Sequence, residues 1–252
     1  MQASIDTISH GAITELRLAR APVNALDPDL CRALAAAVPA AIDAGARGLV
    51  LSGGEKVFSA GLDVPHLLSL PTREAVGAAW TDFLDAARAL AASRVPVAAA
   101  ITGHSPAGGC VLALCCDYRV MAEGPFRIGL NETRVGLVAP EGIQHLMRRA
   151  VGVHRAEQLL VTGELVESAR ALAIGLVDEL AVQEGVVARA IVWLEALLAL
   201  PSKPVLRTRA IARADLVAAL EPRNIDIGTF LDAWDDPDTQ AGLRALVARL
   251  GK

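Results

Sequence analysis

Residues 95–122 read VPVAAAITGHSPAGGCVLALCCDYRVMA, and this stretch carries the main evidence for the fold. Its first part, 95–101, is rich in Ala and Val and predicts a buried strand. A loop over 103–109 then leads into an apolar segment, Gly109 to Cys116, that predicts a buried helix, and Tyr118 to Ala122 predicts a second strand. Strands that alternate with helices in this way are typical of a largely parallel sheet with right-handed crossovers.

The same alternation precedes this stretch. Residues 8–19 predict two paired strands that turn at Gly11, and Asp27 predicts the N-cap of a helix that ends near residue 44. Residues 48–52 predict a further strand and 72–93 a further helix. Beyond Glu141 an apolar spacing of three to four residues predicts helices over 141–151, 154–162, 167–174, 184–199, 205–219 and 238–250. We therefore predict an α/β core over 1–190 and a C-terminal helical region over 191–252.

Composition and charge argue against several classes of function. The 28 acidic residues outnumber the 24 basic ones, and only three residues are lysines, so neither nucleic acid nor an anionic membrane is expected as a partner. The most apolar stretch, 95–120, is interrupted by Pro and Gly, which argues against a membrane span. The first twenty residues lack the apolar segment of a secretory signal. We therefore expect a soluble, cytoplasmic protein.

The four cysteines are Cys31, Cys110, Cys115 and Cys116. They form no CxxC pair and share no metal-ligand spacing with the histidines. We therefore predict buried free thiols and no metal site.

Two glycine-rich loops each follow a predicted strand: GGEKVFSAGLD at 53–63 and GHSPAGGCVLA from residue 103 to 113. Neither matches the phosphate-binding patterns GxGxxG and GxxxxGKS/T. Small residues allow a ligand to lie against the backbone, and the start of a helix supplies N–H groups without partners. Two such loops can direct two N–H groups at one oxygen, which is an oxyanion hole. Tight packing of small residues is the alternative explanation.

Three segments of the chain, 47–64, 95–140 and 150–180, resemble the enoyl-CoA hydratase/isomerase (crotonase) superfamily in their motifs, order and separation. The resemblance implies an α/β fold with a crotonase-like spiral core of ββα turns and a C-terminal helical trimerisation region. It also implies an acyl-CoA thioester as substrate, no separate cofactor, and a homotrimer or a dimer of trimers. By position, the resemblance implies that the backbone N–H groups of Leu62 and Gly108 form the oxyanion hole.

The resemblance further implies a set of residues that bind the substrate and its CoA moiety. The small residues beside the two N–H donors are Ala60, Gly61, Ala107 and Gly109. Residues 19–27 are similar to the stretch that passes near the adenine and pantetheine, which makes Arg20 and Ala21 candidates. Lys203, with Arg207 and Arg209, is a candidate for the 3′-phosphate, in its own subunit or in a neighbouring one. For these basic side chains an exposed position without a ligand is the alternative. The acyl chain is expected beside 64–80.

The number of carboxylates decides which reaction the resemblance implies. Hydratases of the superfamily use two glutamates, and here the first position is Val111, whereas the second keeps Glu132. One carboxylate over an oxyanion hole is sufficient to carry a proton from C2 to C4 of a 3-enoyl thioester. The runs PAGGC, GLNET and GLVAP are most similar to the mitochondrial-type Δ3,Δ2-enoyl-CoA isomerases, which keep a single catalytic glutamate at this position.

We therefore predict an isomerase of fatty-acid β-oxidation that converts 3-enoyl-CoA to 2-trans-enoyl-CoA, with Glu132 as its catalytic residue. A hydratase or another crotonase-fold acyl-CoA enzyme is the alternative. An RNA-binding member without catalysis is disfavoured by the net charge of −4.

Three further residues near these motifs have functional side chains. Glu141 is expected to favour the start of a helix, and it would supply a second acid or base if it reached the site. His104 lies beside Ser105 without a G-x-S-x-G turn, so hydrolase chemistry is not expected, and a place at the pocket mouth stays open. Asp63 is expected to hold the loop backbone by hydrogen bonds.

Overall fold

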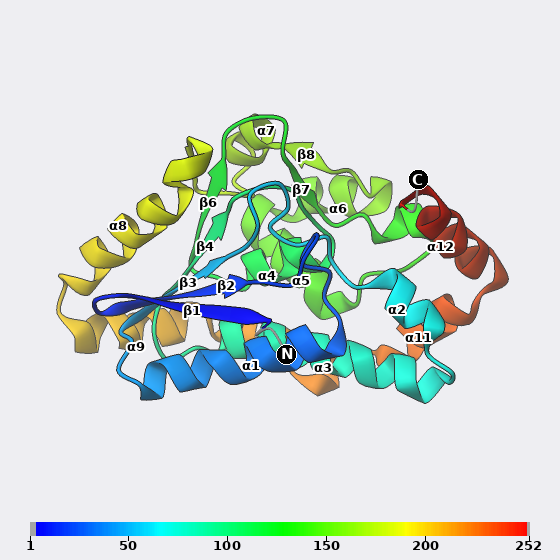
Figure 1. The fold of residues 1–252 in the computed structure, drawn as a ribbon, viewed down its shortest axis with the longest axis horizontal. Helices are drawn as coiled ribbons and strands as arrows, with labels where there is room; N and C mark the ends of the chain where they lie inside the picture. Colours follow the sequence, from blue (N-terminus) through cyan, green and yellow to red (C-terminus); the bar gives the residue numbers. More distant parts are fainter. Residues whose placement is uncertain (1–3, 251–252) are drawn as a thin grey trace.

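Two β-sheets organise the chain, as Figure 1 shows for the computed structural model, which describes residues 4–250. The larger sheet has the strand order β1-β2-β3-β4-β6-β9, and the smaller one has the order β5-β7-β8. In the larger sheet β1 and β2 are antiparallel, and each of the other neighbouring pairs is parallel. The strands are β1 Ile5–His10, β2 Ile13–Leu18, β3 Gly48–Ser52, β4 Val97–Ile101, β5 Ser105–Pro106, β6 Tyr118–Ala122, β7 Arg127–Gly129, β8 Val166–Glu167 and β9 Glu179–Ala181.

Helices connect and cover these strands. The α-helices are α1 Pro28–Asp43, α2 Val64–Ser69, α3 Arg73–Ala91, α4 Gly108–Leu114, α5 Glu141–Val151, α6 Val153–Thr162, α7 Ser168–Ala173, α8 Val186–Leu198, α9 Ser202–Ala212, α10 Ala214–Ala219, α11 Ile227–Asp235 and α12 Pro237–Leu250. Three short 3₁₀ turns are η1 Glu132–Val135, η2 Gln183–Gly185 and η3 Pro222–Asn224. The predicted mixed α/β architecture with C-terminal helices is confirmed.

The central strands of the larger sheet are buried on both faces. Leu16 and Leu18 of β2 belong to the main core, together with residues of α1 and α3. Ile13 of the same strand points to the opposite face, which α8 covers through Val186 and Leu194. Because successive side chains of a strand alternate between faces, one strand contributes to both cores. The short, apolar β3 and β4 are buried along their whole length, as expected for parallel strands between helices.

Local signals in the sequence correctly predicted several element boundaries. The Asp27 carboxylate accepts a 2.8 Å hydrogen bond from the N–H of Leu30, so it caps α1 as predicted. Strand β6 and helix α5 have the predicted bounds. All four cysteines are buried and free, as predicted.

The helix predicted over 205–219 is wrong in one respect, because the chain breaks it into α9 and α10 at Arg213. The backbone leaves the helical conformation there, at φ −107° and ψ 4°, and the Arg213 side chain is buried. Its guanidinium donates to the carbonyl oxygen of Cys115 at 2.6 Å and lies 3.2 Å from the Asp117 carboxylate. The break thus places a cation at the C-terminal end of α4, where carbonyl groups lack helical partners.

The predicted boundary between residues 190 and 191 falls inside α8. Side chains from the C-terminal helices, such as Leu216, Phe230 and Leu243, belong to the same core as the strands. The division into two units therefore stays a prediction. Within 4–250, no single helix has the length and apolarity to cross a membrane, and only the pair 183–198 and 202–212, bent by 113°, has them together.

Candidate active site

The two glycine-rich loops lie directly against each other. A Cβ atom at Gly61 would lie 3.1 Å from the Ala107 Cβ and 3.1 Å from the Gly108 nitrogen. Gly61 also has φ +83°, a conformation that side chains disfavour. At Gly108 a Cβ atom would lie 2.9 Å from a methyl group of Leu26. Gly61 therefore needs to be glycine for the close approach of the two backbones, whereas a side chain at Gly108 would have to displace Leu26.

Each loop has a backbone N–H group that finds no acceptor among residues 4–250. The bridge between Leu26 and Leu62 uses the Gly61 carbonyl oxygen, at 2.8 Å, and the Asp63 N–H, at 3.1 Å, which leaves the N–H of Leu62 free. Gly108 is the first residue of α4, so its N–H has no acceptor inside the helix. The structure thus brings into contact the two segments whose N–H groups are predicted to bind one oxygen.

Arg20 braces the first of these loops. Its guanidinium donates to the Asp63 carboxylate at 2.7 Å and to the Ala25 carbonyl oxygen at 3.1 Å, and it pairs with Asp27 at 2.9 Å. Asp63 also accepts a 3.0 Å hydrogen bond from the N–H of His66, so it holds the backbone by capping α2, and not inside the loop as predicted. All three guanidinium nitrogens of Arg20 thus have partners within the chain. A contact of CoA with Arg20, or with the exposed Ala21 beside it, stays a prediction.

Two buried polar residues that the sequence analysis did not identify also support this loop. Asn24 donates from its side chain to the Phe58 carbonyl oxygen at 3.0 Å, and it adopts φ +50°. Ser59 donates to the Asn24 carbonyl oxygen at 2.8 Å and accepts from the N–H of Gly61 at 3.2 Å. Asn tolerates the left-handed region better than most residues, which was the only local signal for its role.

The second loop is joined to the strand that leads to Glu132. Strands β5 and β7 are parallel, with Pro106 opposite Gly129. The N–H of Ala107 donates to the Gly129 carbonyl oxygen at 2.8 Å. Three residues after β7 ends at Gly129, the 3₁₀ turn η1 begins with Glu132. A short strand pair therefore connects the loop that holds Gly108 to the predicted catalytic residue.

The Glu132 carboxyl is partly shielded from solvent. Its side chain is half-buried, and burial raises its pKa to about 7, opposed only by a hydrogen bond from its own backbone N–H. Within 4–250, no ion pair involves Glu132. The pKa of the Cys110 thiol in α4 is raised, first by burial and then by the charge of Glu132. Because such a charge acts over a short distance, the Glu132 carboxyl lies near the start of α4, where Gly108 is. A carboxyl with this pKa exists in both protonation states near neutral pH, as a proton carrier must.

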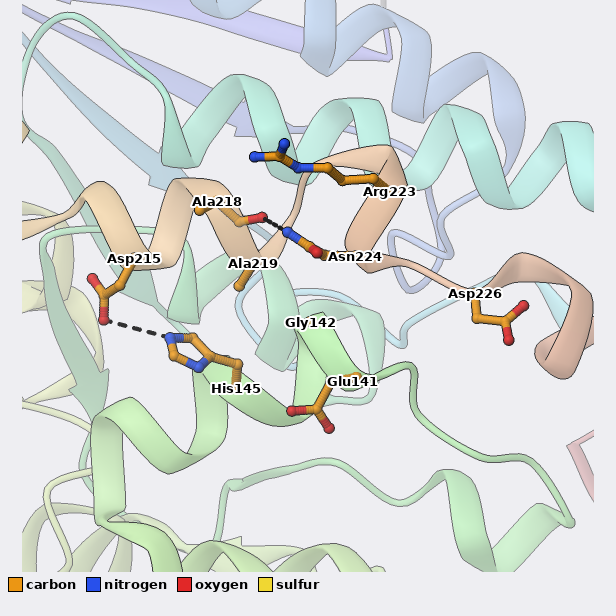
Figure 2. Close-up of a pocket in the computed structure, with 9 residues that line it drawn as sticks. All are labelled: Glu141, Gly142, His145, Asp215, Ala218, Ala219, Arg223, Asn224 and Asp226. Atoms are coloured by element: carbon orange, nitrogen blue, oxygen red, sulfur yellow. Dashed lines mark hydrogen bonds and ion pairs between the residues drawn. The ribbon is translucent and has the colours of Figure 1, made fainter.

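No second carboxylate accompanies Glu132 at the predicted position. Val111 is 1% exposed inside α4 and carries only methyl groups. Glu141 begins α5, as the sequence favoured, and pairs with Arg148 on the surface. Figure 2 shows it in a separate pocket whose lining residues are Glu141, Gly142, His145, Asp215, Ala218, Ala219, Arg223, Asn224 and Asp226. That pocket does not include Leu62, Gly108 or Glu132.

His104 has a structural role in this arrangement. Its Nδ1 atom accepts a 3.1 Å hydrogen bond from the N–H of Arg127, and its ring packs edge-on against Phe126 at 5.5 Å. These contacts hold β7 beside the second loop.

The predicted C-terminal contacts with CoA lie elsewhere. Lys203 is exposed near the start of α9, at the left of Figure 1, whereas α2, which follows the first loop, is at the right. Arg209 is occupied by the Asp117 carboxylate at 2.7 and 2.8 Å. Within one chain the structure does not bring Lys203 to the two loops, so its role stays a prediction.

Comparison with known proteins identifies the family. Residues 9–250 match the family model described as enoyl-CoA hydratase/isomerase. The chain is 32% identical to the mouse protein named enoyl-CoA delta isomerase 1, mitochondrial, over 98% of this chain and 86% of that protein. It is 33% identical to a probable enoyl-CoA hydratase of Mycolicibacterium paratuberculosis, over 88% of this chain and 90% of that protein.

Solved structures agree with this match. The crystal structure of human mitochondrial delta3-delta2-enoyl-CoA isomerase superimposes with a TM-score of 0.92 at 29% identity, covering 98% of each chain. An enoyl-CoA hydratase/isomerase from Mycobacterium paratuberculosis gives a TM-score of 0.87 at 26% identity, covering 97% of this chain and 99% of that one. The sequence motifs, the fold and both comparisons agree: the chain belongs to the enoyl-CoA hydratase/isomerase family.

Proposed function

We propose that the protein is a Δ3,Δ2-enoyl-CoA isomerase that moves the double bond of 3-enoyl-CoA into conjugation with the thioester. The observation that carries the proposal is the single half-buried Glu132 carboxyl, with its pKa raised to about 7, in the absence of a second carboxylate at Val111. Similarity to the mouse isomerase supports the same reaction.

The proposed reaction needs only an anion-stabilising site and one proton carrier. The thioester oxygen accepts hydrogen bonds from the N–H groups of Leu62 and Gly108, which makes the C2 proton more acidic. Ionised Glu132 removes that proton, and the electron pair delocalises over the C3=C4 bond and the thioester as a dienolate. Neutral Glu132 then returns the proton to C4, which leaves a C2=C3 double bond. The substrate and the product have the same atoms and oxidation level.

These two contributions have familiar magnitudes. A positioned acid or base contributes typically about 10² to 10⁴ in rate, and one oxyanion donor contributes roughly 10² to 10³. Hydration of a 2-enoyl thioester requires in addition a group that holds and activates water. Val111 cannot do this, and Glu141 lies in the separate surface pocket. Isomerisation is therefore better supported than hydration.

The proposal also covers the ligands, the oligomeric state and the location of the enzyme. We propose an acyl-CoA thioester as the only organic ligand, with no separate cofactor and no metal. We further propose that the protein forms a homotrimer or a dimer of trimers and acts in the cytoplasm. Sedimentation of the purified protein tests the assembly.

A spectrophotometric assay tests the proposed reaction. Wild type and Glu132→Gln are each incubated with 3-hexenoyl-CoA and, separately, with crotonyl-CoA. We expect wild type to convert the 3-enoyl ester to the conjugated ester and the variant to lose at least about 100-fold in kcat. Full activity in Glu132→Gln contradicts the assignment of the base. Loss of crotonyl-CoA absorbance without isomerisation contradicts the proposed reaction in favour of hydration.

A further inference from the structure

The turn that carries Glu132 is fixed on one side by the end of α6. The Thr133 hydroxyl donates to the Leu160 carbonyl oxygen at 3.2 Å, and Nε of Arg134 donates to the Thr162 carbonyl oxygen at 3.1 Å. These acceptors are carbonyl groups of the last turn of α6, where the Leu160 carbonyl oxygen also accepts a 3.3 Å hydrogen bond from the N–H of Gly163, the cap of the helix. One side of η1 is thus anchored within the core region of the chain.

The other side of η1 is held by α12. The Thr239 hydroxyl donates to the carbonyl oxygen of Gly136, which ends η1, at 2.9 Å, and Thr239 is only 4% exposed. Gly136 has φ +83°, and a Cβ atom there would lie 2.5 Å from the Thr239 hydroxyl oxygen and 3.0 Å from its Cα. Backbone and hydroxyl are therefore in direct contact, with no room for a side chain.

Helix α12 has a defined position at this contact. The Asp236 carboxylate accepts hydrogen bonds from the N–H groups of Asp238 at 2.9 Å and Thr239 at 3.2 Å, which fixes the first turn of the helix. The same helix packs against α2, which begins two residues after Leu62. In Figure 1 the red α12 and the cyan α2 lie at the same end of the molecule. Helix α12 therefore contacts η1, which begins with Glu132, and α2, the helix that directly follows the loop of Leu62.

From these contacts we infer that Thr239 is a positioning residue, which holds the Glu132 turn in register with the loop that carries Leu62. A 3₁₀ turn of four residues has weak hydrogen-bond geometry of its own and depends on external anchors. Proton transfer tolerates little displacement of the base, and a 1 Å error can cost about 100-fold in rate. This inference rests on the proposed isomerase function, because the base position matters only for the proton-transfer step.

Three variants test the inference. Thr239→Val removes the hydroxyl and keeps the shape, whereas Thr239→Ser keeps the hydroxyl. Thr81→Val is the matched control, since the Thr81 hydroxyl also donates to a backbone carbonyl oxygen, that of Gly77, at 2.9 Å, but on the exposed face of α3. Activity with 3-hexenoyl-CoA, and the rate of backbone hydrogen exchange over residues 131–138, are measured for each variant and for wild type.

We expect Thr239→Val to lower kcat by about 10- to 100-fold while KM changes by less than about threefold, because the thioester is still held by the loop donors. The deuterium isotope effect at C2 should rise in this variant, since the proton transfer becomes slower. Thr239→Ser and Thr81→Val should stay within about threefold of wild type. A Thr239→Val enzyme with the kcat of wild type overturns the inference.

Hydrogen exchange tests the role of Thr239 independently of the proposed isomerase reaction. The N–H of Leu137 donates to the Glu132 carbonyl oxygen at 3.0 Å, so its exchange reports on the closure of the turn. We expect exchange over 131–138 to accelerate at least about tenfold in Thr239→Val and to remain unchanged in Thr81→Val. Wild type that fails to isomerise 3-hexenoyl-CoA refutes the proposed function, while unchanged exchange in Thr239→Val refutes the role of Thr239 for any substrate.

Discussion

The amide of Ala107 donates a 2.8 Å hydrogen bond to the carbonyl oxygen of Gly129, and this bond connects the two parts of the candidate site. Ala107 precedes the N–H donor Gly108, and Gly129 ends the strand that leads to Glu132. Ala107 itself has φ +47°, which a residue with a side chain rarely adopts. Such an unfavourable backbone conformation persists only where the surroundings impose it, and here the surroundings are the two loops and β7.

The pH dependence of turnover should follow the ionisation of Glu132. Because burial raises its pKa to about 7, we expect kcat/KM to fall about tenfold per pH unit below 7 and to reach a plateau above it. The pH–rate profile with 3-hexenoyl-CoA checks this. A profile that declines instead near pH 4.5, the ordinary pKa of a glutamate, would contradict the effect of burial on Glu132.

Ionisation of Glu132 should lower the free energy of unfolding of the protein. Its pKa in the folded state is raised, so the neutral form favours folding, and stability is lost as pH rises from about 4.5 to about 7. We expect Glu132→Gln to be more stable than wild type at pH 8, by at most about 3 kcal/mol, and of similar stability at pH 4.5. Urea unfolding at both pH values measures the difference. If Glu132→Gln is more stable than wild type by the same amount at both pH values, ionisation of Glu132 is not the cause of the difference.

Gly61→Ala should impair the site because the new methyl group meets the second loop. It would lie 3.1 Å from Ala107 and from the Gly108 nitrogen, which displaces the N–H donors. We expect a loss of roughly 10² to 10³ in kcat/KM, as for the loss of one oxyanion donor. Gly152→Ala is the control, since Gly152 has nearly the same φ, +81°, and nothing within 4 Å of its Cβ position. Equal losses in both variants would assign the effect to backbone strain alone.

Arg20→Met distinguishes a loop brace from a phosphate contact. If Arg20 acts by pairing with Asp27 and Asp63, the loss of kcat/KM should be the same for acyl-CoA and for the acyl-pantetheine thioester, which lacks the nucleotide. We expect a loss of about tenfold for each substrate, because the loop that holds Leu62 is less well ordered. A loss confined to acyl-CoA would show that Arg20 contacts the phosphates instead.

Arg213→Met should destabilise the fold without changing the chemistry. The variant leaves the Cys115 carbonyl oxygen without its buried donor, whereas Asp117 keeps its pair with Arg209 at 2.7 and 2.8 Å. We therefore expect a loss of about 1 to 3 kcal/mol in the free energy of unfolding. Arg223→Met, which breaks the exposed pair with Glu221, should change it by less than about 1 kcal/mol. Denaturant titration checks both values. Similar losses in the two variants would contradict the importance of burial.

The sequence alone predicted the elements whose signals are local and long enough. A short apolar run marked β3, the segment Tyr118 to Ala122 after the apolar helix marked β6, and helical spacing over eleven residues marked α5. Asp27 marked the start of α1. Strands β5 and β8, with two residues each, carry no periodicity to detect, and they exist because β7 pairs with both of them.

The candidate site also has features that the sequence predicted and features that it did not. The glycine spacing and the position of Glu132 were visible in the chain, because close backbone approach needs residues without side chains. The pKa of Glu132, the use of Arg20 as a brace and the contact of Thr239 with Gly136 were not visible. Each of these depends on which distant segments exclude water from a group or supply its partner, and sequence periodicity contains no information about that. The sequence thus determined the fold and the candidate chemistry, and the tertiary structure decided the charge, the partners and the position of the groups involved.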